Sequence, residues 1–125
     1  MEIISTEQAP AAVGPYSQAV KAGDTVYCSG QIPIDPATGT LVDGPADVQA
    51  RRAILNLRAV LQAAGGDLAN VVKTTVFLAD ISDFAAVNDV YAELFGAAKP
   101  ARSCLAAAAL PKGAKIEIEA IAVLD

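Results

Sequence analysis

The pattern of apolar and polar positions divides the chain into strands and helices. Residues 16–21 and 24–30 are two β-like runs near its start. Ala22-Gly23 separates them by a short turn, so the pattern favours a β-hairpin. A loop from Pro33 to Pro45 follows this hairpin.

Apolar residues recur at helical spacing in two later segments. The first predicted helix begins at Asp47, whose side chain can cap it, and runs to about Ala64, before a pair of glycines. The second is capped by Ser82 and ends before Gly96. The predicted apolar faces consist of Ala50, Ile54, Leu57 and Leu61 in the first helix and Phe84, Val87, Tyr91, Leu94 and Phe95 in the second.

Three further segments are predicted to be strands. Residues 71–79 are rich in β-branched side chains, and their imperfect alternation indicates a strand covered on both faces. Residues 101–110 and 115–124 are interpreted as two strands joined by a turn at residues 111–114. The second of them alternates almost ideally, and one face carries Ile116, Ile118, Ala120, Ala122 and Leu124.

The order ββ-α-β-α-ββ predicts an α+β fold. It would form one domain over residues 1–125, with two helices packed on one face of a mixed sheet. The other face then needs a cover of its own. Apolar residues make up 54% of the chain, a large share for a small monomer. We therefore expect a homo-oligomer whose sheets meet around a central axis.

Composition limits the location and the chemistry. No apolar run reaches the roughly 18 residues that cross a bilayer, and no signal peptide is recognisable, so we expect a cytoplasmic protein without a membrane partner. The net charge of −5 argues against a nucleic-acid partner. The absence of histidine excludes Ser-His-Asp triads, Cys-His dyads and most zinc sites. We predict no metal site, and chemistry carried by carboxylates, Tyr, Lys, Arg or a thiol.

The last two predicted strands carry the candidate charged groups. Glu117 and Glu119 share the face opposite the isoleucines, about 7 Å apart, although an ordinary solvated face explains them equally well. Arg102 and Cys104 point to one side of the preceding strand, and a guanidinium suits two-point contact with a carboxylate. The plainer alternatives are an arginine paired loosely with an acidic neighbour and a buried cysteine. Both Cys28 and Cys104 are expected to be reduced thiols, and no histidine base is present to activate them.

The predicted strand geometry keeps Arg102 and Glu117 apart. In a simple hairpin Glu117 lies opposite Ala108, and the six residues from there to Arg102 span about 20 Å. The two groups can therefore share one small molecule only if they come from neighbouring subunits, or if the strands do not form a simple hairpin.

Two positions in the first half are further candidates. Tyr16 follows a rigid Gly-Pro turn, where its hydroxyl could orient a substrate or a water, although a core aromatic with a wet tip fits equally. Gly30 lies near the end of a predicted strand and would let a ligand approach the backbone; a β-bulge is the alternative.

Taken together, these segments resemble the reactive intermediate deaminase family, RidA, also called YjgF. The resemblance covers nearly the whole chain, and PARSC followed by IEIEAIA is its most specific part. The matching segments are APAAVGPYSQAV (9–20), SGQIPIDPATG (29–39), VVKTTVFLADISDFAAVNDVYAELF (71–95), PARSC (100–104) and LPKGAKIEIEAIAV (110–123).

The resemblance implies a chorismate-mutase-like fold and a homotrimer with active sites between subunits. It also implies hydrolysis of 2-imino or enamine acids, such as 2-iminopropanoate and 2-iminobutanoate, to 2-keto acids and ammonia, without cofactor or metal. The implied roles are carboxylate binding by Arg102, water handling by Glu117, lining of the site by Tyr16, a main-chain contact at Cys104 and a structural carboxylate at Glu119. Asn88 matches the asparagine of the family's helix motif and is expected to help bind the substrate.

Two other functions stay open. The same cleft could bind 2-keto acids or other small carboxylates without turnover, as a regulatory module. A ribonuclease or translation inhibitor, as reported for some relatives of the family, is disfavoured by the acidic charge and the missing histidines.

Overall fold

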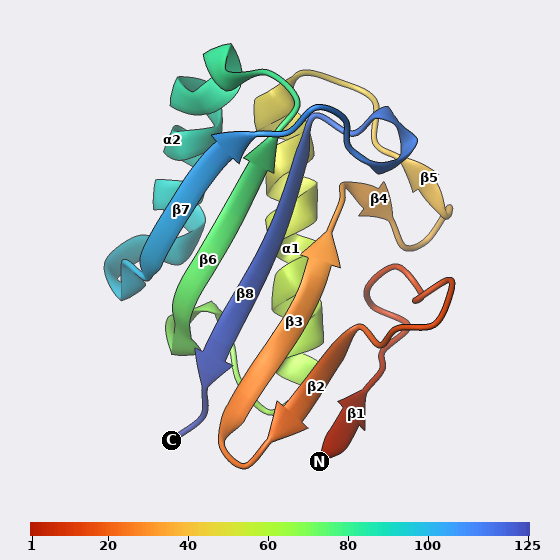
Figure 1. Cartoon of the computed structure of the whole chain (residues 1–125), viewed down its shortest axis with the longest axis vertical. Helices are drawn as coiled ribbons and strands as arrows, with labels where there is room; N and C mark the ends of the chain where they lie inside the picture. Colours follow the sequence, from red (N-terminus) through yellow and green to blue (C-terminus); the bar gives the residue numbers. More distant parts are fainter.

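The computed structural model describes residues 1–125 and consists of a six-stranded sheet, a small two-stranded sheet and two long helices (Figure 1). The strands of the main sheet are β1 (Glu2–Ile4), β2 (Ala19–Ala22), β3 (Thr25–Gln31), β6 (Val71–Leu78), β7 (Ala101–Ala106) and β8 (Ile116–Val123). The small sheet consists of β4 (Ile34–Asp35) and β5 (Thr40–Leu41), and the helices are α1 (Ala46–Ala63) and α2 (Phe84–Phe95). Single 3₁₀ turns are found at Leu68–Asn70, Ile81–Asp83, Gly96–Ala98 and Pro111–Gly113.

The main sheet has the strand order β1-β2-β3-β8-β6-β7. β6 and β7 are parallel and all other neighbours are antiparallel, so the sheet is mixed, as predicted. The predicted hairpin between the last two strands is wrong, because β6 lies between β7 and β8. β6, α2 and β7 form a β-α-β unit whose two strands are neighbours. β7 therefore occupies the outer side of β6, and β8 pairs with its inner side.

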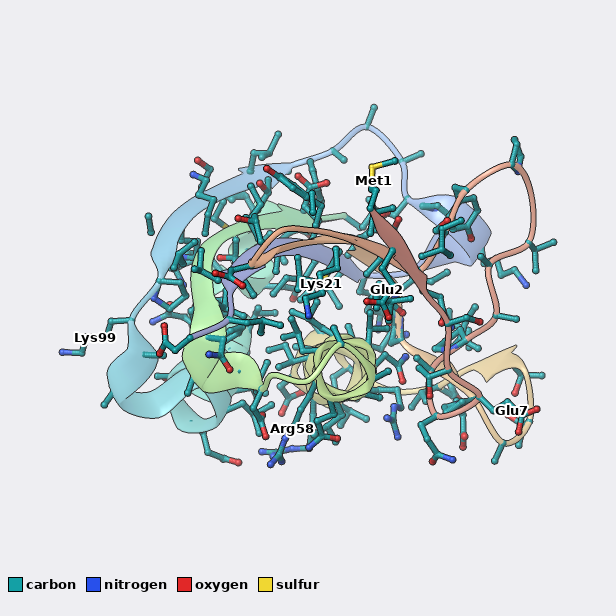
Figure 2. All side chains as sticks on the ribbon, turned by 90° about the horizontal axis from the view of Figure 1, so that it is seen from below. Met1, Glu2, Glu7, Lys21, Arg58 and Lys99 are labelled. Carbon is teal, nitrogen blue, oxygen red and sulfur yellow. The ribbon has the colours of Figure 1, made fainter.

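Both helices pack on the same face of the sheet, which confirms that part of the prediction. Figure 2 shows α1 end-on beneath the curved sheet with α2 beside it, and Arg58 pointing away from the sheet. The side chains predicted for the apolar stripe of α1 are completely buried. Against them pack the buried residues of the central strands, Val26, Val76, Leu78, Ile116 and Ile118.

The predicted helix caps are wrong in both helices. α1 begins after Pro45, which makes no side-chain capping bond, and Asp47 lies inside the first turn, where its charge favours the positive end of the helix dipole. Ser82 belongs to a 3₁₀ turn that precedes α2, and the carboxylate of Asp80 accepts its backbone N–H at 2.9 Å. α2 itself begins at Phe84.

Several boundaries also differ from the prediction. β7 ends at Ala106 rather than at residue 110, because its neighbour β6 ends at the paired residue, Leu78. One last hydrogen bond joins the Ala107 N–H to the Leu78 carbonyl. The N-terminal strand β1, which was not predicted, pairs with β2. The loop from residue 33 to residue 45 contains the β4–β5 hairpin.

Buried amide side chains fix the irregular segments to the core. Gln18, Gln49 and Asn56 are all nearly inaccessible. Asn56 of α1 donates to the carbonyls of Ile32 and Ile34 at 3.2 and 2.8 Å, and so anchors the segment between β3 and β4. Each of these amides satisfies backbone groups that would otherwise be buried without partners.

No helix covers the sheet face away from α1 and α2. Apolar side chains on it stay accessible: Ile3 is 70% exposed, Tyr27 51%, Leu105 43% and Val123 39%. We call this surface the open face. Neither helix has the length and apolar content that a membrane span requires.

We predict that Asn56→Ala lowers the free energy of unfolding by about 3 kcal/mol, because it removes the amide donor to the Ile34 carbonyl and one of the two donors to the Ile32 carbonyl, and creates a small cavity. Urea unfolding followed by circular dichroism measures the change. The control is Gln62→Ala on the exposed side of the same helix, which should cost less than about 0.5 kcal/mol. Equal losses in the two variants would contradict the anchoring role.

Candidate active site

A cavity of about 540 Å³ brings together three of the predicted site residues. Tyr16 from the N-terminal segment, Gly30 from β3 and Glu117 from β8 line it. Apolar groups such as Val13 and Ile32 form part of the wall. We call this cavity the Glu117 cavity.

Glu117 lies against the backbone of Gly30. The pairing of β3 with β8 shifts register between Cys28 and Gln31, which confirms a β-bulge at this point. A Cβ atom at position 30 would lie 2.0 Å from Oε2 of Glu117, so any larger residue would displace the carboxylate from this position. Burial, and secondarily the charge of Glu119, raises the pKa of Glu117 above its usual value. The carboxylate is thus able to take up and release a proton closer to neutral pH.

Tyr16 is 54% exposed and its hydroxyl accepts the Val13 N–H at 3.4 Å, so the ring is not a core aromatic. The loop that carries it is fixed by Gln18, which sequence reasoning missed. The Gln18 amide accepts the Thr6 N–H at 2.7 Å and donates to the Pro10 carbonyl at 2.7 Å. A buried glutamine with several backbone partners has no local signature in the sequence.

Lys112 also lines the Glu117 cavity and was considered only as a turn residue. Its backbone is left-handed, with φ of 56°, a conformation that non-glycine residues rarely adopt. It supplies the only positive charge in the cavity wall. Its position follows from the insertion of β8 between β3 and β6, which the predicted hairpin did not include.

The remaining predicted residues form a second cluster, on the helix face of the sheet. Nη1 of Arg102 on β7 donates to Oδ1 of Asn88 on α2 at 2.8 Å. The guanidinium carbon also lies 4.7 Å from the ring centre of Tyr91 and 5.4 Å from that of Phe84. These contacts hold the cation by hydrogen bonding and by cation–π attraction.

The two cysteines are free thiols. Cys104 packs against the core on the same face as Arg102, and burial raises the pKa of its thiol, a shift that the Arg102 charge opposes. Burial raises the pKa of Cys28 to about 12. Neither sulfur is therefore a thiolate near neutral pH, and neither is set up as a nucleophile.

Within one chain the two clusters do not meet. Arg102 pairs with Thr74 of β6, whereas Glu117 pairs with Phe77 on the other side of the same strand. Positions three residues apart on a strand point to opposite faces and are separated by about 10 Å along it. The loss of the simple hairpin therefore does not bring the groups together, and each chain presents two separate half-sites.

No group of three His, Cys, Asp or Glu side chains is placed to hold a metal ion. A second hollow, of about 270 Å³, lies on the outer surface of α1. Of its two cations, Arg51 is already engaged by Glu93 through two bonds of 2.6 and 2.9 Å, and Arg52 donates to Oδ1 of Asn56 at 3.1 Å. The Glu117 cavity and the Arg102 cluster remain the candidate site.

A family model, a curated relative and two solved structures all match nearly the whole chain. A model of the family described as Endoribonuclease L-PSP matches residues 6–124. The 2-iminobutanoate/2-iminopropanoate deaminase of Capra hircus is 58% identical over 97% of this chain and 88% of its own length. The crystal structure of RidA from an Antarctic Psychrobacter is 48% identical, with a TM-score of 0.95 over 99% of this chain and 100% of its own. That of E. coli TdcF with bound serine is 44% identical, with a TM-score of 0.95 over the whole of both chains.

We predict that Glu117→Gln raises the melting temperature at neutral pH. A raised pKa in the folded state means that ionised Glu117 destabilises the fold, fully so above that pKa. The destabilisation disappears as the pH falls through the raised pKa towards the ordinary value of 4.5. The advantage of the variant should shrink over the same pH range. Melting curves at several pH values measure it, with Glu7→Gln at an exposed position far from Glu117 in the sequence as control; a pH-independent difference would contradict the assignment.

Proposed function

This chain belongs to the Endoribonuclease L-PSP family, and on that premise we propose that it hydrolyses 2-imino and enamine acids, such as 2-iminopropanoate and 2-iminobutanoate, to 2-keto acids and ammonia. The printed name of the goat relative is that activity. The observation that carries the proposal is the partly buried carboxylate of Glu117, whose pKa is raised inside a cavity of substrate size.

Glu117 manages the water and the proton in this proposal. The carbon of an imine is already electrophilic, so the catalyst has to place a water beside it and move protons. Glu117 takes a proton from the attacking water as the oxygen–carbon bond forms and passes it to the nitrogen, which gives a carbinolamine. It then moves the remaining hydroxyl proton to the amino nitrogen, so that the carbon–nitrogen bond breaks, ammonia leaves and the carbonyl of the 2-keto acid forms. Tyr16 and the backbone at Gly30 border the reacting atoms.

Arg102 holds the substrate carboxylate. Asn88 uses one of the five guanidinium N–H donors, so enough donors remain for a two-point contact with a carboxylate. The TdcF structure contains bound serine, an amino acid of the same carboxylate-bearing class. The main chain at Cys104 lies two residues further along β7 and supplies a further contact in this account.

The two half-sites combine when subunits assemble. We infer a homotrimer with a chorismate-mutase-like arrangement, in which the Arg102 cluster of one subunit closes the Glu117 cavity of the next. The accessible apolar side chains of the open face support this, since burying them against other subunits is favourable. The proposed hydrolysis needs no cofactor. We also propose that the protein is located in the cytoplasm.

The family description refers to a ribonuclease, but the electrostatics favour the deaminase. RNA binding depends on neutralising phosphates, and this chain has a net charge of −5. The Glu117 cavity holds a single lysine and no other cation.

We predict that Arg102→Lys lowers kcat/KM about 100-fold, equivalent to about 2.7 kcal/mol, because a lysine keeps the charge but loses the two-point contact. The assay follows ammonia release from freshly generated 2-iminopropanoate. Arg58→Lys, at the surface ion pair with Asp67, is the matched control and should be silent.

Wild-type protein that binds 2-keto acids without accelerating ammonia release would instead identify a binding module. Nuclease activity that Arg102→Ala leaves intact would point to a contaminant. Full activity of Arg102→Lys would remove Arg102 from the proposed role.

A further inference from the structure

The guanidinium of Arg102 rests on one face of α2, formed by Phe84, Asn88 and Tyr91 at spacings of four and three residues. We call these three residues the α2 cradle. An arginine side chain free in solvent samples many rotamers, and binding a ligand would have to restrict them. The cradle imposes that restriction before any ligand arrives.

Tyr91 is itself fixed by a buried hydrogen bond. Its hydroxyl lies 2.7 Å from Oγ1 of Thr74, and Thr74 is completely inaccessible to solvent. Thr74 is also the residue of β6 that pairs with Arg102 in the sheet. The strand beside Arg102 therefore holds the ring on which the guanidinium lies. The ring also packs against Phe95, with ring centres 4.4 Å apart.

We propose that Thr74 and Tyr91 are positioning residues for the carboxylate-binding arginine. Their hydrogen bond fixes the plane of the tyrosine ring, and the ring fixes the plane of the guanidinium, whose N–H groups then point outward within that plane. This role rests on the proposed function, because it concerns how Arg102 meets a substrate carboxylate. Neither residue touches the reacting atoms, so both should affect binding more than the chemical step.

The test measures the affinity for 2-oxobutanoate, the keto acid that 2-iminobutanoate would yield, by calorimetric titration of the intact protein. Thr74→Val removes the hydroxyl with little change of shape, and the Kd should rise about threefold. Thr74→Ser keeps a hydroxyl and should bind as wild type does. KM should rise in parallel with Kd while kcat stays close to that of wild type. Thr40→Val, which removes an exposed hydroxyl on β5, is the control.

Two further variants keep the test decisive. Thr74→Val/Tyr91→Phe removes both hydroxyls and leaves no buried orphan, so it replaces the single variant if that one does not fold. In an Arg102→Lys background the same changes should have no further effect on Kd. Unchanged affinity of Thr74→Val and of the double variant, or an equal loss in the Arg102→Lys background, would overturn the positioning role alone. Wild-type protein that neither binds nor hydrolyses would overturn the proposed function, and this role with it.

Discussion

The position of β8 between β3 and β6 determines what this chain can do alone. The β6–α2–β7 unit pairs its two parallel strands directly, so the last strand occupies the inner side of β6. The alternation of β8 then turns Ile116 and Ile118 to the helices and Glu117 to the open face. On β7 the same rule turns Arg102 to the helices. Register and alternation on the two strands therefore put the two charged groups on opposite faces of one sheet.

The two half-sites have opposite electrostatic characters, which suits their proposed roles. Glu117 is partly desolvated and close to a second carboxylate, so its pKa is raised and it can exchange protons. Arg102 is held by an amide oxygen and two aromatic rings, with no carboxylate neutralising it, so its charge remains free for an anion.

Local periodicity predicted much of the fold. The stripe of α1 from Ala50 to Leu61 and the alternation from Ile116 to Ala122 could be predicted because a face needs only its own spacing. The neighbours of β8 could not, because they depend on competition between strands distant in sequence. The predicted capping residues were wrong, because Asp47 and Ser82 each lie one or two residues away from the true N-cap position.

In the candidate site too, residues with a local or family signature could be predicted, and residues that depend on distant partners could not. Glu117, Arg102 and Tyr16 were found from residue chemistry and from the family resemblance. Gln18 and Lys112 were missed as cavity residues, since their roles depend on tertiary partners. Tyr91 was predicted only as part of an apolar helix face, because nothing in the local sequence indicates that its hydroxyl meets Thr74.

Mixing two inactive variants tests whether each active site is shared between adjacent subunits. Arg102→Ala and Glu117→Gln subunits are co-refolded in equal amounts, and ammonia release from 2-iminopropanoate is compared with that of wild type. If each site takes its arginine and its glutamate from adjacent subunits of a ring, random mixing restores about one quarter of the sites. Such a recovery is the predicted result. No recovery above the separate variants, with mixed assembly verified, would contradict a site shared between subunits.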